Sequence, residues 1–96
     1  MKWVINWKLF DRDNVEIICF FKTPYVVEEL CKTKNGEYIW AVYGLFEWEY
    51  INKIHNLKYV SLQDIMLWYQ EVQSMGFTLQ KEEEFFKEFQ DKIEKV

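Results

Sequence analysis

Residues 37–51 constrain the fold of this chain more than any other stretch. They contain six aromatic side chains and the only alanine of the sequence, and they follow the turn signal Asn35-Gly36. Over 38–43 the side chains on both alternating faces of an extended chain are apolar. This pattern predicts an inner strand, because such a strand is buried on both faces. Gly44 then predicts a bend or bulge, where a side chain would restrict the backbone.

The N-terminal quarter of the chain has the pattern of two strands. Residues 2–10 and 15–22 each alternate between two faces with a period of two. Between them, Asp-Arg-Asp-Asn at 11–14 supplies turn chemistry, since Asp and Asn side chains bond their own backbone and tolerate left-handed angles. We therefore predict that 2–10 and 15–22 pair as an antiparallel hairpin.

Two segments fit either a helix or a strand. Thr23-Pro24 has the chemistry of a helix start, and apolar residues at helical spacing predict a helix over 25–34. The alternative is a strand, since Tyr-Val-Val at 25–27 favours β structure and 34–37 suits a hairpin turn. The segment 46–57 is equally open, because its aromatic residues alternate as in an edge strand but also fit one helical face.

The C-terminal third predicts two amphipathic helices. Ser61 caps the first, with Asp64 three residues on as a shorter capping box, and Gly76 ends it. Its apolar stripe consists of Leu62, Ile65, Met66, Tyr69 and Val72, widened by Trp68.

Thr78 is predicted to cap the last helix, which would form a helical hairpin with the first. Its apolar face is predicted to consist of Phe85, Phe86, Phe89, Ile93 and Val96.

These segments predict one α+β domain over residues 1–96. The expected architecture is a small antiparallel sheet of about three strands, in the order β-β-α-β-α-α, packed by amphipathic helices and closed by the C-terminal helical hairpin. The two cysteines, Cys19 and Cys31, have neither a CxxC spacing nor a dense disulfide pattern, so we expect buried free thiols in a reducing cytoplasm.

Charge and hydropathy disfavour two classes of partner. The chain has 12 basic and 16 acidic residues, a formal net charge of −4, whereas phosphate binding needs clustered Lys and Arg. No run approaches the ~20 apolar residues of a membrane span, and Asn6 and Lys8 interrupt the apolar start of the chain. We therefore expect a cytoplasmic protein that binds neither nucleic acid nor membrane.

The titratable residues match no catalytic or metal-binding motif. His55 is the only histidine, and neither cysteine stands in a recognised spacing to it. Glycine-rich phosphate loops, nucleophile elbows and HExxH helices are missing from the sequence. The expected protein is not an enzyme and carries no metal or cofactor.

Two acidic groups are candidate contacts. Glu47 and Glu49 would share one face of a strand, with the aromatic residues Phe46, Trp48 and Tyr50 beside them. The two carboxylates would then be partner contacts or the charged, solvent-facing side of an edge strand. The further alternative is that they are the carboxylates of a small hydrolase or ligand-binding site.

The second group is the acidic run at Glu82, Glu83 and Glu84. It suits the positive end of a helix, and its alternative role is to mimic the phosphates of nucleic acid. Lys81, Lys87, Lys92 and Lys95 dilute that mimicry.

Aromatic residues make up 20% of the chain, more than one covered sheet face requires. Exposed aromatic patches mark interfaces, so the favoured function is a non-enzymatic protein-protein interaction module. Inhibitors carried by phages or other mobile elements, and immunity proteins, often have this size and acidity, and we expect the partner of this chain to be a protein with a basic surface. A homodimer through an open sheet face is a further alternative. The predicted contacts are Glu47, Trp48, Glu49 and Tyr50, followed by Glu82, Glu83 and Glu84.

Overall fold

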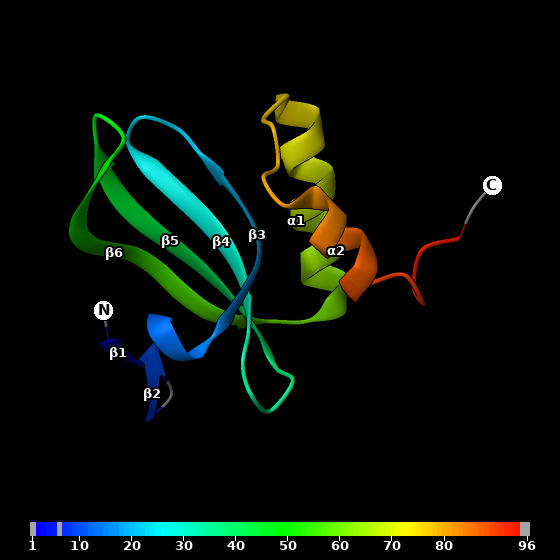
Figure 1. Cartoon of the computed structure of the whole chain (residues 1–96), viewed down its shortest axis with the longest axis horizontal. Helices are drawn as coiled ribbons and strands as arrows, with labels where there is room; N and C mark the ends of the chain where they lie inside the picture. The colour runs from blue at the N-terminus through cyan, green and yellow to red at the C-terminus, as the bar shows by residue number, and fades with distance from the viewer. Residues whose placement is uncertain (1, 6, 95–96) are drawn as a thin grey trace.

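The computed structural model describes residues 2–5 and 7–94, except for the side chains of 50–52. A four-stranded antiparallel sheet in the order β3-β4-β5-β6 carries α1 and α2 on one face, and a separate hairpin of β1 and β2 lies at the other side (Figure 1). The elements are β1 (Lys2–Ile5), β2 (Lys8–Asp11), the short 3-10 helix η1 (Arg12–Asn14), β3 (Glu16–Lys22), β4 (Val26–Lys32), β5 (Tyr38–Phe46), β6 (Glu49–Val60), α1 (Leu62–Met75) and α2 (Glu82–Glu88).

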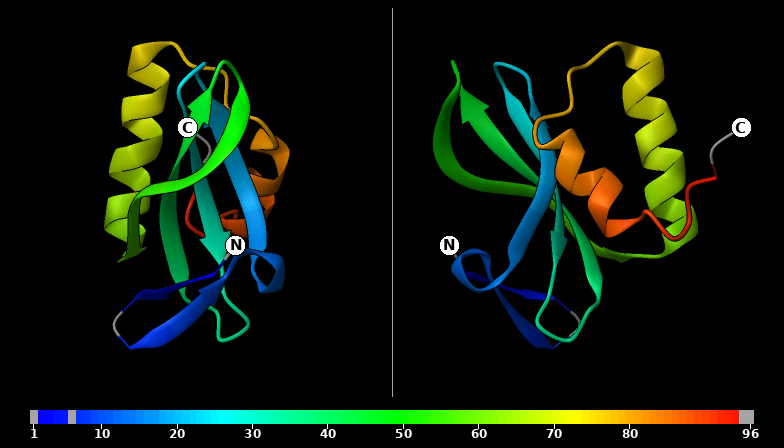
Figure 2. Two further views of the ribbon diagram at one scale, coloured as in Figure 1. Left: turned by 90° about the vertical axis from the view of Figure 1, so that its left-hand side faces the viewer. Right: turned by 45° about the vertical axis from the view of Figure 1, so that its right-hand side comes forward.

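The predicted sheet of about three strands in the order β-β-α-β-α-α is wrong. The described residues form a four-stranded sheet, a two-stranded sheet and two α-helices, which fits the predicted α+β class only loosely. The four strands of the main sheet follow one another along the chain, each antiparallel to the next. The views in Figure 2 show this sheet strongly twisted, with the helices packed against one side.

The predicted helix over 25–34 is a strand, β4. The two glutamates of this segment, Glu28 and Glu29, both have partners within the fold. Arg12 donates two hydrogen bonds to Glu29, and the indoles of Trp40 and Trp68 donate to Glu28. The alternative hairpin turn is present, because β4 pairs with β5 across residues 33–37.

The predicted pairing of 2–10 with 15–22 is also wrong. The chain reverses inside the first segment, so that Ile5 lies opposite Lys8 and β1 pairs with β2. β3 pairs with β4 instead. One continuous strand would place Trp3 and Phe10 on opposite faces, whereas the hairpin pairs them on the same face. Because both residues are apolar, the alternating pattern did not reveal the reversal.

The inner strand predicted at 38–43 is confirmed as the first part of β5, which pairs with β4 on one side and β6 on the other. Its register against β6 shifts between Val42 and Tyr43 and again between Tyr43 and Leu45, so the irregularity predicted at Gly44 is present. The segment 46–57, which fitted either a strand or a helix, forms the end of β5, a turn and most of β6. β6 is an edge strand of the sheet.

The first helix begins and ends as predicted. The Ser61 side chain accepts a hydrogen bond from the Asp64 backbone N–H, and the Asp64 carboxylate accepts one from the Ser61 backbone N–H. Gly76 ends α1 with a φ of 76°, in the left-handed region that glycine adopts without a Cβ clash. Of the predicted stripe, Ile65, Tyr69 and Val72 are buried, whereas the remaining members are partly or largely exposed.

The prediction that Thr78 caps the last helix is wrong, because α2 starts only at Glu82. The backbone before it pairs with β3 instead: Phe20 and Gln80 exchange backbone hydrogen bonds of 3.2 and 2.7 Å. The α2 helix ends at Glu88, so Ile93 lies beyond it, and Val96 lies outside the described residues.

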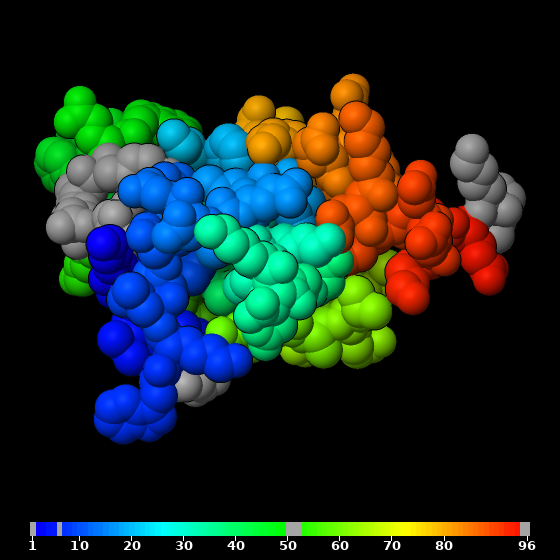
Figure 3. All heavy atoms as spheres, turned by 60° about the horizontal axis from the view of Figure 1, so that its bottom comes forward, coloured from blue at the N-terminus to red at the C-terminus, as the bar shows by residue number. Residues whose placement is uncertain are grey.

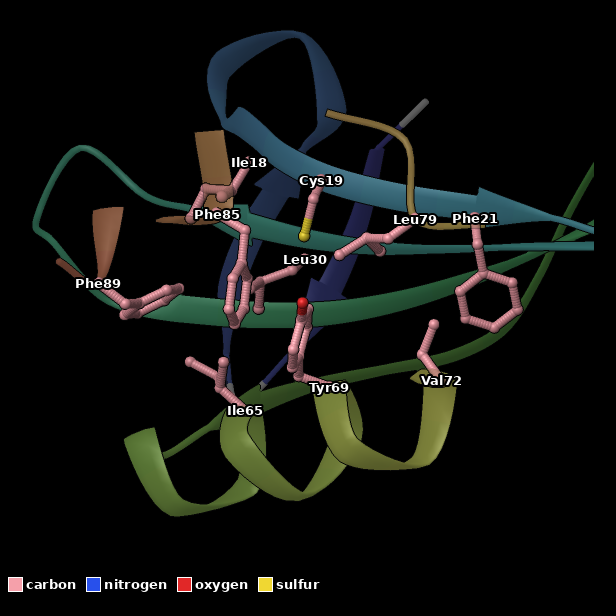
Figure 4. Close-up of a cluster of buried hydrophobic side chains, with 10 residues drawn as sticks. All are labelled: Ile18, Cys19, Phe21, Leu30, Ile65, Tyr69, Val72, Leu79, Phe85 and Phe89. Atoms are coloured by element: carbon pink, nitrogen blue, oxygen red, sulfur yellow. The ribbon is translucent and has the colours of Figure 1, made fainter. Parts of the chain in front are cut away.

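Buried side chains fill both faces of the main sheet. On the second face, Val27, Ala41, Tyr43 and Leu45 form a smaller cluster, against which Trp3 of the N-terminal hairpin packs. On the helix-covered face, side chains from the sheet and from both helices point toward one another (Figure 4). This larger cluster consists of Ile18, Cys19, Phe21, Leu30, Ile65, Tyr69, Val72, Leu79, Phe85 and Phe89.

Cys19 and Cys31 are free and buried, as predicted. Burial raises the pKa of each thiol to about 12, so both remain protonated at neutral pH. Neither α-helix of the described part of the chain has the length and apolarity to cross a bilayer.

Acid should destabilise the fold partly through Glu88, which connects α2 to the sheet. Its carboxylate accepts hydrogen bonds from Lys32 Nζ at 2.8 Å and from Tyr38 Oη at 2.6 Å. Burial of Glu88 opposes ionisation, but these two bonds and the Lys32 charge outweigh it and lower the pKa of Glu88 below its ordinary 4.5. The contribution of ionised Glu88 to the free energy of folding is therefore complete above pH 4.5, and it is lost as the pH falls through the lowered pKa of Glu88. We expect the melting temperature of Glu88→Gln to fall less steeply with acid than that of the wild type; parallel curves would contradict this.

Candidate functional site

Two loops meet at one end of the main sheet and present large aromatic side chains. The Trp48 backbone N–H donates to the Pro24 carbonyl at 3.1 Å, and the Leu45 N–H donates to the Tyr25 carbonyl at 2.7 Å. The β3–β4 and β5–β6 loops consequently lie side by side (Figure 1). Tyr25, Phe46 and Trp48, which we call the aromatic tip, are 65%, 61% and 55% exposed.

Trp48 lies in a turn that is unfavourable for so large a residue. Phe46 pairs with Glu49, which leaves Glu47 and Trp48 as a two-residue loop with φ of 48° and 75°. Hairpin loops with two positive φ angles strongly favour Asn, Asp and Gly. For other residues the left-handed conformation costs roughly 1–2 kcal/mol. Backbone strain concentrates at functional sites, so the half-exposed Trp48 is a candidate contact.

A hollow of about 530 Å³ adjoins the aromatic tip. Trp48 forms part of its lining together with Phe20 and Lys22 of β3 and the segment that follows α1. Within that segment, Phe77 stacks on the buried Phe21 with ring centroids 5.0 Å apart, which anchors this side of the hollow to the core. The tip therefore offers an aromatic projection beside a partly apolar depression.

Of the predicted contacts around the turn, Trp48 lies in the aromatic tip and is exposed. Glu47 and Glu49 are exposed as well. The prediction that these two carboxylates share one face of a strand is wrong, because Glu47 lies in the turn and β6 begins only at Glu49. The side chain of Tyr50 lies outside the described residues.

The acidic run Glu82–Glu84 forms the first turn of α2 and is exposed, as predicted. Glu82 also has a structural contact, since its Oε1 accepts a hydrogen bond of 2.5 Å from Tyr69 Oη. Burial, the hydrogen bond to Glu82 and the charge of Glu82 together raise the pKa of Tyr69 to about 12. Glu84 lies 3.6 Å from Lys87 Nζ. The structure does not bring this run into the aromatic tip.

Tyr25 is a further contact that was not predicted. The predicted helix over 25–34 included Tyr25, whereas Thr23 Oγ1 accepts hydrogen bonds from the backbone N–H groups of Tyr25 and Val26 and closes a turn. The Thr-Pro pair followed by β-prone residues was the available signal, because serine and threonine hydroxyls also close turns in this way.

The sheet face on which the homodimer hypothesis depended is covered. Phe10 is buried, and Trp3 packs against the second core cluster. The N-terminal hairpin projects from one corner of the molecule (Figure 3) and keeps its own exposed side chains at Val4, Trp7 and Leu9. Trp7 is 98% exposed and has a φ of 61°, so it also occupies a left-handed turn position.

His55 is exposed on β6. Within the described residues, no three side chains of His, Cys, Asp or Glu lie grouped as metal ligands would. No protein-family model, no curated protein and no solved structure matches the chain.

Proposed function

We propose that this chain is a non-enzymatic module that binds another protein through the aromatic tip. The observation that carries the proposal is the position of Trp48, which is half exposed in a strained turn where folding alone would favour glycine or asparagine. Phe46 and Tyr25 extend the same surface. Tryptophan and tyrosine are among the commonest binding hot spots, because they bury much apolar area and also carry a polar group.

The charges beside the tip favour a partner with a basic surface. Glu47 and Glu49 are exposed next to Trp48, and the whole chain has a net charge of −4. Opposite charges at the rim of an interface speed association and select among partners. A small acidic protein that binds in this way would modulate its partner as an inhibitor or immunity protein does. The free thiols Cys19 and Cys31 support a reducing compartment such as the cytoplasm.

Replacing Trp48 by glycine should separate binding from folding. Glycine adopts the left-handed turn without strain, so we expect the free energy of unfolding of Trp48→Gly to stay within about 1 kcal/mol of the wild type. Retention of the partner on immobilised protein should fall at least about tenfold, as for a hot-spot residue. Urea denaturation and quantitative pull-down from a host lysate measure the two effects.

Trp7→Gly is the matched control, because Trp7 is also an exposed tryptophan in a left-handed hairpin turn. It should leave partner retention unchanged. A loss of binding in Trp7→Gly alone would move the interface to the N-terminal hairpin. A large loss of stability in Trp48→Gly would instead make Trp48 a packing residue.

A photo-crosslinking side chain gives an independent test of the location. Placed at Phe46, it should form a covalent adduct with the same partner that the pull-down retains. Placed at Leu9, which is similarly exposed at 65%, it should not.

A further inference from the structure

A second, smaller hollow lies between α1 and the β5–β6 side of the sheet, away from the aromatic tip. Its volume is about 180 Å³. Leu30 and Ile65, which are almost fully buried, contribute apolar lining, and Trp40 and Trp68 contribute aromatic lining. Trp40 lies near the start of β5, whereas the tip lies at the end of that strand.

A single carboxylate oxygen holds both tryptophans. Trp40 Nε1 donates to Glu28 Oε1 at 3.1 Å, and Trp68 Nε1 donates to the same oxygen at 3.2 Å. The two rings come from β5 and α1, so Glu28 of β4 orients side chains from two other elements. Because the N–H edge of each indole is already bonded, the π faces are the part of each ring that remains suited to a ligand.

One of these rings already has an alkylammonium neighbour within the chain. Lys58 Nζ lies over the Trp40 ring, 5.1 Å from its centroid, which is within the range of a cation–π contact. Lys58 lies directly across from Trp40 on β6 and is exposed. An exposed lysine of this kind is displaced at small cost, since such contacts contribute only modestly in water.

Carboxylates outnumber cations around the hollow. Asp64 and Glu71 line it with Lys58, and Glu28 adjoins it through the two indoles. Burial raises the pKa of Glu28 against the opposing indole hydrogen bonds, and the charge of Glu71 raises it further. The two glutamates therefore repel each other, and a cation bound in the hollow would relieve that repulsion.

We propose that this pocket binds an alkylammonium ion of side-chain size. Its aliphatic part contacts Leu30 and Ile65, and its charged group lies against Trp40 and Trp68 in the place that Lys58 partly occupies. The volume corresponds to about six waters at roughly 30 Å³ each, well below the ~300–1,000 Å³ of pockets for drug-sized ligands. The ligand is either a lysine side chain of a bound protein or a free amine of the same size.

Titration with n-butylammonium, followed by the indole N–H signals of the five tryptophans in NMR spectra, tests the proposal. The signals of Trp40 and Trp68 should shift saturably. The uncharged isostere 1-butanol should shift them much less, because it lacks the cation. Equal binding of butanol, or no saturable shift at Trp40 and Trp68, would overturn the proposal.

Two variants test the roles of the charges. Lys58→Thr removes the internal competitor and keeps a residue suited to a strand, so butylammonium should bind about two- to fivefold more tightly. Glu71→Gln should weaken binding about twofold or more, whereas Glu83→Gln on α2 should have no effect. Weaker binding by Lys58→Thr would contradict the displacement of Lys58.

Lysine with both its backbone ends capped distinguishes the two sources of the ligand. If it binds as tightly as butylammonium, the pocket accepts the side chain of a protein. If its backbone prevents binding while butylammonium still binds, the ligand is a free amine.

Discussion

Phe85→Ala should destabilise the protein by about 3–5 kcal/mol, the usual cost of truncating a buried phenylalanine. Phe85 is 2% exposed, and its ring stacks on Tyr69 with centroids 4.4 Å apart. The centroid of the Phe85 ring also lies 4.9 Å from that of Phe89. Loss of the Phe85 ring would therefore open a cavity where α1, α2 and the sheet meet. Small domains are stable by only about 5–15 kcal/mol, so this variant would be close to unfolding at room temperature. Urea denaturation followed by tryptophan fluorescence measures the change.

The neighbouring Phe86 is a matched control in the same helix. It is 44% exposed, and we expect Phe86→Ala to cost less than about 1 kcal/mol. The pair of variants therefore determines which side of α2 faces the core. Equal losses of unfolding free energy in Phe85→Ala and Phe86→Ala would show that Phe85 does not face the core more than Phe86 does.

Arg12→Ala should also cost about 3–5 kcal/mol, because it leaves a carboxylate buried without its ion-pair partner. Arg12 Nη2 lies 2.6 Å from Glu29 Oε2, and Nε lies 3.2 Å from Oε1, which makes the pair bidentate. Glu29 is only 1% exposed. Water therefore cannot replace the guanidinium, and the loss should appear as a lower urea midpoint with an unchanged slope.

Two comparisons distinguish burial from a simple loss of charge. The double variant Arg12→Met with Glu29→Leu should recover most of the lost stability, because apolar residues of similar volume often replace a buried ion pair without cost. Lys8→Ala breaks the exposed Lys8–Glu37 pair, whose side chains are 61% and 42% exposed, and should cost less than about 1 kcal/mol. If Arg12→Ala costs as little as Lys8→Ala, Glu29 is solvated in the folded state.

The Arg12–Glu29 pair also explains how the N-terminal hairpin is held. Arg12 directly follows β2, and its guanidinium lies 5.5 Å from the centroid of the Tyr43 ring in β5. Trp3 contacts the same ring at 5.5 Å. The hairpin is thus attached to the second face of the sheet by the Arg12–Glu29 ion pair and a small aromatic cluster, in addition to the exposed Lys8–Glu37 pair. The sequence pattern left this face uncovered.

The candidate site was only partly predictable. The aromatic surplus and the Trp48 segment indicated a binding surface near residues 47–50, and Trp48 is exposed there. The sequence did not indicate that Tyr25 belongs to the same surface, because the two loops are brought together by backbone bonds between Pro24 and Trp48 and between Tyr25 and Leu45. Such bonds exist only once the four strands are in register.

The pocket between α1 and the sheet could not be predicted from the sequence, for a similar reason. Trp40 and Trp68 each fit an apolar stripe of their own element, where a tryptophan is most simply a core residue. Their common hydrogen-bond acceptor, Glu28, lies in the segment that was predicted as a helix over 25–34. Only the packing of α1 on the sheet brings the three side chains together.

The sequence by itself determined the features whose physics lies within a few residues. These are the capping box of Ser61 and Asp64, the end of α1 at Gly76, and the inner strand with its irregularity at Gly44. Each depends on backbone angles or hydrogen bonds between near neighbours, so local residue types suffice to predict it.

Only the tertiary structure decided that 26–32 is a strand. The apolar spacing of 25–34 fitted a helix, yet the two glutamates of this segment are satisfied by Arg12, 17 residues from Glu29, and by Trp68, 40 residues from Glu28. A buried carboxylate is tolerated only when it is paired and hydrogen-bonded, and partners so distant become visible only when the chain is folded.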